Sequence, residues 1–266
     1  MSADRAPNTL RRFFGRPNDD RGKTLAVALL VALGCGLLVS TAAVALRPIQ
    51  AANIEAARAR QMLAMLESVP GMSQILAASE VELWVVDLDT GTVDREIDAA
   101  GFDQAAEAAD PERSTALSRS EDLAGLGRRE NRALVHVLTE PDGAIALVVL
   151  PVRGTGYQST IRAYLALEGD LSTVAAFTVY EQGETAGLGS RVAERAWQAQ
   201  WPGKEIFADG SVAFDVVPSG ASGPYEVDGI SGATVTSYAV ADMLLFWMGE
   251  RGFGPFLEIL KAGDTR

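Results

Sequence analysis

The segment Asp228-Gly-Ile-Ser-Gly-Ala-Thr-Val-Thr-Ser237 is the most informative stretch of this chain of 266 residues. The carboxylate of Asp228 is followed by two glycines and by the hydroxyl side chains of Ser231, Thr234 and Thr236, and an apolar helical pattern begins directly afterwards. A glycine turn with hydroxyls at a helix start suits a phosphate, because free N–H groups and the helix dipole point at it. The alternative is an ordinary helix capped by a Ser or Thr side chain, which residue types alone favour because such caps are common.

The composition limits the class of protein. Nearly half of the residues are apolar, so a core is possible, and the length fits one anchored domain or two small ones. The net charge is −12, with six basic and three acidic residues in positions 1–46, so the remainder carries −15. This acidity argues against a nucleic-acid partner, because no surface that would neutralise phosphates is evident. A single cysteine, Cys35, excludes an intrachain disulfide framework.

Residues 25–46 contain no charged residue and are numerous enough to cross a bilayer as a helix. Basic residues concentrate before this run, which predicts an inner-membrane protein with a cytoplasmic N-terminus and its remaining residues in the periplasm. The alternative is a cleaved signal peptide, since Ala43-Val-Ala45 resembles a cleavage site. The apolar run and its leader are both long for a signal peptide, which favours a membrane anchor.

The rest of the chain predicts an α+β fold. A helix that leaves the membrane is expected over residues 47–67, with Pro48 at its start and Pro70-Gly71 at its end. Strands are expected over residues 81–87, 133–138, 144–150, 161–167, 173–180 and 212–217. Helices are expected over residues 191–200, after the opening motif, and after residues 252–256. Residues 99–127 are interpreted as a surface excursion, and residues 154–157 as a flexible break.

Missing motifs exclude several kinds of site. The glycine-rich loop at residues 181–189 lacks the spacing of a dinucleotide fingerprint, and the chain has no P-loop lysine motif. The only histidine, His136, falls in an expected strand, where a lone histidine is more often structural than catalytic. No catalytic residue and no metal ligand is therefore expected.

Residues 228–234 resemble the flavinylation motif D-x-x-S/T-G-A-T of the FMN-binding domain family. The resemblance implies an FMN whose phosphate is joined to the oxygen of Thr234 as a phosphoester, and it matches Asp228 to the motif's carboxylate. In that family a separate flavin transferase makes the bond from FAD. The charge that the phosphodiester keeps would lie where helix N–H groups stabilise it.

Other stretches resemble, in the right order, the C-subunit family of sodium-translocating NADH:quinone reductases. They are residues 39–48, 86–91, 180–189 and 252–257. Two positions depart from that family. Ala186 stands where proline is usual, so the loop is expected to be less rigid, and residues 156–159 replace the usual Gly-Leu-Trp, which leaves the aromatic residue near the flavin undetermined.

This resemblance implies an electron relay through the covalent FMN. Electrons would come from an iron–sulfur centre held by the D and E subunits, and would pass to a second covalent FMN in the B subunit. They start on NADH at the F subunit and end on ubiquinone, while sodium crosses the membrane elsewhere. The implied partners are therefore the other subunits of the reductase (A, B, D, E and F), the flavin transferase and membrane lipid.

The resemblance also assigns residues to the cofactor site. Thr185 and Leu188 are expected to contact the flavin ring, and Glu184 and Gly187 are expected to support their loop. The residues expected around the phosphate are Asp228, Ser231, Gly232, Ala233, Thr234 and Thr236.

The expected organisation has four parts: a cytoplasmic segment (1–24), a transmembrane helix (25–46), a membrane-proximal helix with an α/β portion (47–140), and the FMN-binding domain (141–266). Three alternatives stay open from the sequence. The first is the G subunit of an Rnf-type ferredoxin:NAD oxidoreductase, which shares the flavin motif and a similar loop. The second is a membrane-anchored regulator whose flavin domain does not relay electrons, and the third is a flavin-free periplasmic domain.

Overall fold

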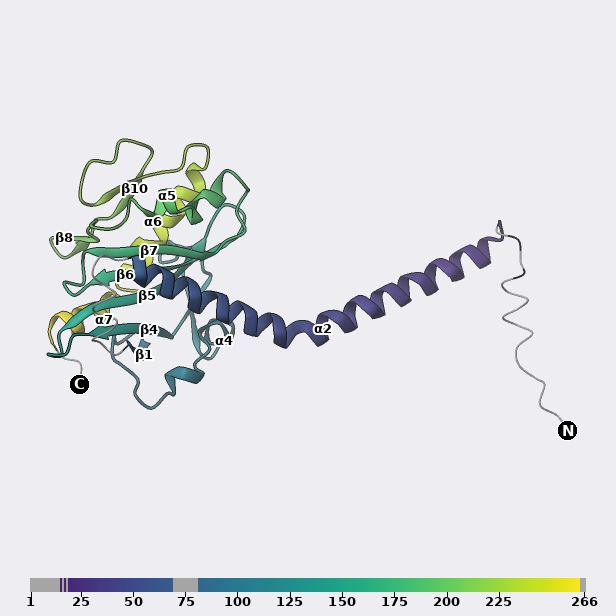
Figure 1. Ribbon diagram of the computed structural model, residues 1–266, viewed down its shortest axis with the longest axis horizontal. Coiled ribbons are helices and arrows are strands. Elements are labelled where there is room, and N and C mark those ends of the chain that lie inside the picture. Colours follow the sequence, from purple (N-terminus) through teal and green to yellow (C-terminus); the bar gives the residue numbers. More distant parts are fainter. Residues whose placement is uncertain (1–14, 16, 18, 69–80, 264–266) are drawn as a thin grey trace. The chain divides into compact units, whose positions relative to one another are not determined.

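The computed structural model describes residues 15, 17, 19–68 and 81–263 (Figure 1). Internal contacts divide the chain into two units, Met1–Ala57 and Arg58–Arg266, and each is described here by itself. Most of the predicted cytoplasmic segment and the predicted helix end at Pro70-Gly71 lie outside the described residues.

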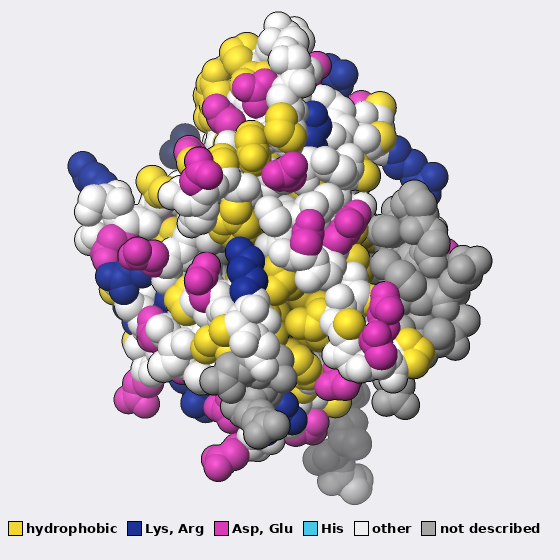
Figure 2. Space-filling view, turned by 90° about the vertical axis from the view of Figure 1, so that its left-hand side faces the viewer, with side chains coloured by type: hydrophobic (Ala, Val, Ile, Leu, Met, Phe, Trp, Pro, Cys, Tyr) yellow, Lys and Arg dark blue, Asp and Glu magenta, His cyan; other side chains and the backbone are white. Residues whose placement is uncertain are grey.

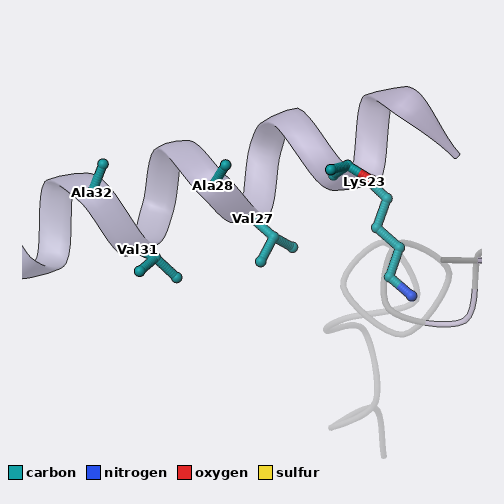
Figure 3. A pocket seen from close by; sticks show the side chains of 6 residues that line it. Lys23, Val27, Ala28, Val31 and Ala32 are labelled. Atoms are coloured by element: carbon teal, nitrogen blue, oxygen red, sulfur yellow. The ribbon is translucent and has the colours of Figure 1, made fainter. Parts of the chain in front are cut away.

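The long first helix, α2 (Arg21–Ser68), contains a stretch, Arg21–Gln50, that is long and apolar enough to cross a membrane. No part of the most apolar window of this stretch is buried, as a surface that faces lipid or other membrane helices requires. Figure 3 shows side chains of its first turns around a shallow hollow: Lys23, Val27, Ala28, Val31 and Ala32. The helix is a candidate membrane anchor.

Helix α2 continues from the apolar stretch through residues 47–67, as predicted, and Pro48 lies in its interior. A proline in a helix interior removes one backbone hydrogen bond and crowds the preceding turn. The residues around it include many alanines and leucines, which favour the helical state. The helix therefore continues through Pro48.

A five-stranded antiparallel sheet with the order β1-β4-β5-β6-β7 forms the centre of the second unit (Figure 1). Its strands are β1 (Val81–Asp87), β4 (Arg132–Thr139), β5 (Ile145–Thr155), β6 (Thr160–Glu168) and β7 (Val174–Glu181). Five of the six predicted strands are thereby confirmed. The predicted domain boundary at residues 140/141 falls between β4 and β5, which pair within this sheet.

Apolar side chains bury both faces of the sheet. Along β4, Ala133, Val135 and Val137 point into the main core, as the alternation of a strand requires. Leu138 belongs instead to a second cluster that includes Met65 of α2. Burial on both faces explains why the strands contain long apolar runs with few polar interruptions.

Shorter elements surround the sheet. In chain order they are η1 (Ala99–Gly101), α4 (Gln104–Ala109), β2 (Ser114–Ala116), β3 (Arg128–Glu130), η2 (Gly189–Ala193), α5 (Arg195–Gln198), β8 (Phe207–Ala208), β9 (Ser211–Val212), β10 (Asp215–Val217), β11 (Glu226–Asp228), α6 (Thr234–Met248) and α7 (Gly254–Lys261). The two C-terminal helices confirm the prediction, and so does the excursion with short helices before β3.

Two predicted elements are broken in the structure. The helix expected over residues 191–200 is split into η2 and α5, because Glu194 between them has an extended backbone. The strand expected over residues 212–217 is split into β9 and β10; between them the N–H groups of Ala213 and Phe214 bond to the Ile206 carbonyl, and Phe214 is buried in the core. In addition, β10 pairs in parallel with β11, a strand that we did not predict.

Strand β5 is longer than predicted, and two of its residues explain how. Pairing with β4 ends at Val149, so Pro151, which has no N–H, lies beyond the β4 ladder. Gly154 lies inside the strand and does not form the predicted flexible break. A Cβ at Gly154 would lie 3.0 Å from the Cβ of Met243, so glycine lets helix α6 pack closely on β5.

An aromatic stack lies beneath the segment that leads to the motif. The ring of Trp201 lies between Phe177 and Phe214, with centroid distances of 4.0 and 4.6 Å. Trp197 packs edge-on against Trp201, and its Nε1 donates a hydrogen bond of 2.8 Å to the carbonyl of Asp228. The core thereby fixes the backbone that enters the motif.

A buried arginine links distant parts of the second unit. The side chain of Arg129 donates to Asp89 Oδ1 at 2.7 Å and to the carbonyl of Arg251 at 2.8 Å. Gly91, in the same turn as Asp89, has a positive φ of 76°, and a Cβ there would lie 2.4 Å from the carbonyl carbon of Pro255. The turn after β1 is therefore held tightly against the start of α7.

Acidic residues dominate the charge of the molecule. On the face shown in Figure 2, Lys and Arg side chains are separated by acidic, polar and apolar ones and do not gather into one patch. Among the coloured residues, this face offers no continuous basic surface of the kind that binds a phosphate backbone.

His136 of β4 is a largely buried titratable residue. Its ring meets Tyr164 edge-on, and its Nδ1 has no hydrogen-bond partner among the described residues. Burial lowers the pKa of His136 to about 4, so the folded chain holds it neutral.

We predict that this histidine makes the chain less stable in mild acid. The unfolded state takes up a proton near its usual pKa of about 6.5, which the folded state does not. Its contribution is therefore fully present above that pH and declines as pH falls toward about 4. Urea unfolding of the wild type and of His136→Leu at a series of pH values checks this, and equal pH dependence in the two proteins would contradict it.

Candidate functional site

The start of helix α6 leaves backbone donors free. Ala233 occupies the N-cap position, and no side chain caps the helix. The N–H groups of Thr234, Val235 and Thr236 find no acceptor among the described residues. The predicted helix start is confirmed, but the ordinary Ser or Thr cap is not present. Free N–H groups at the positive end of a helix favour an anion.

The hydroxyls of the motif differ in their availability. Thr236 is buried, and its hydroxyl donates a hydrogen bond of 2.7 Å to Glu184. Ser237 is also buried, and its hydroxyl donates to the Ala233 carbonyl at 3.0 Å. Thr234 is exposed, and its hydroxyl has no partner among the described residues. Of the hydroxyls on the first turn of the helix, Thr234 is the one open to reaction.

A hollow of about 360 Å³ lies beside Thr234. Three exposed side chains on its rim are apolar or aromatic: Tyr157 is 65% exposed, Val235 57% and Leu188 44%. The residues that line the hollow are Tyr157, Glu184, Thr185, Leu188, Gly189, Gly232, Ala233, Thr234, Val235 and Thr236. Three separate segments therefore build one cavity, and their exposed apolar side chains suit a planar ring.

Glu184 connects these three segments. One carboxylate oxygen accepts hydrogen bonds from the N–H groups of Gln158 and Ser159, both at 3.0 Å, and from the Ser159 hydroxyl at 2.9 Å. The other accepts from the Tyr157 N–H at 3.1 Å and from the Thr236 hydroxyl at 2.7 Å. One buried side chain thus fixes the loop before β6 and the start of α6 relative to each other.

The carboxyl of Glu184 is ionised at neutral pH. Burial raises its pKa, but the hydrogen bonds from Thr236, Gln158 and Ser159 lower it by more, so the pKa lies below its usual range. Two glycines make room for the carboxylate. A Cβ at Gly156 would lie 2.7 Å from Glu184 Oε1, and a Cβ at Gly189 would lie 2.6 Å from Thr236 Oγ1.

The loop after β7 places Thr185 and Leu188, the two predicted contacts of the flavin ring, in the lining of the first hollow. The carbonyl of Thr185 accepts hydrogen bonds from the N–H groups of Leu188 and Ser190, at 3.1 and 3.2 Å. Gly187 has a positive φ of 73°, and its N–H donates to the Ser190 hydroxyl at 3.0 Å. These bonds shape the turn although Ala186 stands where the sequence resemblance led us to expect proline.

A second hollow, of about 290 Å³, lies against the motif. It shares Gly232 and Thr234 with the first hollow and is lined in addition by Ser231 and Tyr238. Thr234 therefore borders both hollows. The sequence left open which aromatic residue lies near the flavin. The two candidates are Tyr157 at the first hollow and Tyr238 at the second.

Asp228 and Gly187 line neither hollow. The Asp228 carboxylate accepts a hydrogen bond of 2.8 Å from the Ala221 N–H, and its own N–H donates to Gln200 Oε1 at 2.9 Å. In this geometry Asp228 stabilises the turn that precedes the motif and does not face a cavity, so a direct contact with a cofactor stays a prediction.

Sequence reasoning missed three residues of the first hollow. Val235 follows Thr234 on the exposed face of the helix, Gly189 closes on Thr236, and Tyr157 lies on the loop held by Glu184. Tyr157 lies in residues 156–159, which depart from the family pattern. That departure was the one sequence feature that pointed to a role for Tyr157 at the site.

The segment that contains both the loop of Tyr157 and helix α6 matches a known domain. Residues 156–248 match the model of the FMN-binding domain. The chain is 42% identical to the C subunit of the Na(+)-translocating NADH-quinone reductase of Pseudomonas aeruginosa, over 91% of this chain and 97% of that protein. It is 40% identical to the C subunit of the same reductase in Vibrio alginolyticus, over 93% of this chain and 98% of that protein. The chain belongs to the C-subunit family of Na⁺-translocating NADH-quinone reductases.

Solved structures of this C-subunit family share the fold. The crystal structure of NqrC from Shewanella oneidensis has a TM-score of 0.68 and 35% identity, and the match covers 76% of this chain and 95% of that one. The C subunit from Parabacteroides distasonis, at 24% identity and a TM-score of 0.59, matches 80% of this chain and 96% of that one and supports the fold alone. The predicted α+β fold, an apolar N-terminal helix followed by a β-rich domain, is confirmed.

In this member of the C-subunit family, two threonines on one helical turn should respond differently to the same substitution. Thr236→Val removes a donor from a buried carboxylate, and we predict a loss of about 1.5–3 kcal/mol in the free energy of unfolding. Thr234→Val changes an exposed side chain without a partner, so its effect should stay within about 0.5 kcal/mol.

The measurement is urea unfolding of the full chain, purified from a host without a flavin transferase. Equal stabilities of the two variants would show that the bond between Thr236 and Glu184 does not carry the link between loop and helix.

Proposed function

We propose that this chain carries FMN on Thr234 through a covalent phosphoester and relays electrons within a sodium-translocating NADH:quinone reductase. The observation that carries the proposal is the hydroxyl of Thr234. It is exposed and unbonded, and it lies on a helical turn with three free N–H groups. The match to the FMN-binding domain and the names of the relatives supply the cofactor and the complex.

The proposed attachment is a phosphoryl transfer from FAD. The oxygen of Thr234 bonds to the phosphorus of the FMN half and loses its proton, and the bond to the AMP half breaks, so AMP leaves. The free N–H groups of Val235 and Thr236 would be available to stabilise the phosphodiester charge, as a helix start does for anions. Thr236 and Ser237 do not compete, because both hydroxyls are buried and already donate hydrogen bonds.

The first hollow is the proposed place of the flavin ring. Leu188, Val235 and Tyr157 present apolar surface there, and Thr185 lies on its wall. Bound FMN supplies one-electron chemistry that no side chain of this site can perform. The work of the chain is to hold the ring in place and to set its electrostatic surroundings.

The proposed setting follows from the anchor and from the family. Helix α2 would cross the inner membrane with the N-terminus in the cytoplasm, and the FMN-binding domain would lie in the periplasm. The proposed electron donor is the iron–sulfur centre of the D and E subunits, and the proposed acceptor is the FMN of the B subunit. The A and F subunits, the flavin transferase and membrane lipid complete the proposed partners. Identity over nearly the whole length of the C-subunit relatives favours this assignment over an Rnf-type subunit or a regulator.

Substituting Thr234 should abolish the covalent flavin. We predict that wild-type chain, made in a host with the flavin transferase, carries the mass of one FMN residue on the peptide spanning residues 225–240 and fluoresces in a gel under ultraviolet light. Thr234→Val lacks the side-chain oxygen to which we assign the ester and should show neither signal.

Ser222→Ala is the control, because it removes an exposed hydroxyl from the loop before the motif that lines neither hollow, and it should keep the added mass. Fluorescence and added mass that survive Thr234→Val would refute Thr234 as the attachment point.

The relay itself is tested in the assembled reductase. A complex that contains Thr234→Val should still oxidise NADH with a soluble artificial acceptor, because electrons enter at another subunit. Its quinone reduction should fall to background, because the proposed relay is interrupted. Normal quinone reduction in a complex shown by mass to lack this flavin would rule out the relay role.

A further inference from the structure

The first hollow has a single charged side chain in its wall. Glu184 is the only acidic or basic residue among those that line it, and it is 7% exposed. None of the ion pairs among the described residues involves Glu184. A buried carboxylate without a basic partner is unusual, because removing a charge from water is costly unless it is compensated.

Neutral groups alone compensate this charge. The carboxylate accepts five hydrogen bonds, from three backbone N–H groups and from the hydroxyls of Ser159 and Thr236. Such donors hold the carboxyl ionised, as its lowered pKa indicates. They do not cancel its negative charge, which therefore acts on whatever occupies the hollow.

We propose that the negative charge of Glu184 lowers the reduction potential of the flavin held in this hollow, so that Glu184 sets the electron affinity of the site as well as its shape. The inference rests on the proposed function, because it requires the flavin ring to lie beside Thr185 and Leu188. An added electron brings negative charge toward the carboxylate, and repulsion between them disfavours reduction. Because the carboxylate is buried, dissolved salt screens this repulsion only weakly.

Thr236 opposes this effect. Its hydroxyl donates to the carboxylate oxygen that also meets the Tyr157 N–H. Removing that donor leaves the carboxylate less compensated, and the repulsion felt in the hollow grows. The two substitutions Glu184→Gln and Thr236→Val both alter the hydrogen bond between these side chains, yet they should move the potential in opposite directions.

The experiment is an anaerobic redox titration of the full-length flavinylated chain in detergent, followed by flavin absorbance. Glu184→Gln keeps the size of the side chain and removes its charge, and we expect a potential more positive than wild type. A change on the order of tenfold in the electron-transfer equilibrium corresponds to about 59 mV for a one-electron step. Thr236→Val should give a potential more negative than wild type.

Glu168→Gln is the matched control, because Glu168 is an exposed glutamate that lines neither hollow. It should leave the potential unchanged. Covalent FMN is measured in every variant by mass, so that loss of attachment, which bears on the proposed function, is distinguished from a change of potential.

An unchanged or more negative potential in flavinylated Glu184→Gln overturns the inference and leaves the attachment to Thr234 standing. A shift of both site variants in the same direction also overturns it, because that outcome reports altered shape and not charge. If Glu184→Gln does not retain FMN, Thr236→Val decides alone: a potential below wild type supports the inference, and a potential equal to or above wild type overturns it.

Discussion

The hydrogen bond from the Thr236 hydroxyl to the Glu184 carboxylate is the contact on which the geometry of the site depends. Its two ends lie 52 positions apart in the chain, one in the loop after β7 and the other on the first turn of α6. Through the same carboxylate the loop of Tyr157 is held as well. Without this contact, the start of α6 would lose the hydrogen bond that ties it to the carboxylate holding the loop of Tyr157, and the walls of the hollow beside Thr234 would be held less firmly.

Helix α6 is fixed at both ends, which allows its first residue to serve as a rigid support. At the N-terminal end it is held by Glu184, and at the C-terminal end the Nε1 of Trp247 donates a hydrogen bond of 2.7 Å to the carbonyl of Arg153 in β5. Between them, Met243 packs on Gly154. The sheet therefore positions Thr234 through contacts made along the whole helix and not only at the site.

Local patterns in the sequence were enough to predict the strands of the sheet and the start of α6. Residues 133–138 were predicted as a strand, and in the structure Ala133, Val135 and Val137 of β4 share one face. The resemblance of the motif also singled out Thr234 among several hydroxyls, and the structure places it on the exposed side of the turn. What the sequence could not supply were contacts between distant residues. Phe214 lies between β9 and β10, where the predicted strand is broken, and it stacks on Trp201; no local pattern indicates that packing.

The hydrogen bonds of Arg129 to Asp89 and to the carbonyl of Arg251 limit how the chain can be truncated without loss of the site. The stretch that matches the FMN-binding domain, residues 156–248, contains neither β1, β4 and β5 nor helix α7. Arg129 ties the turn after β1 to the connection before α7, so both flanks of that stretch belong to one folded body. A graft limited to the matched stretch would lose three of the five strands and leave apolar surface uncovered. The smallest transplantable flavin carrier must therefore include both flanks, which makes it considerably larger than the stretch by which it is recognised.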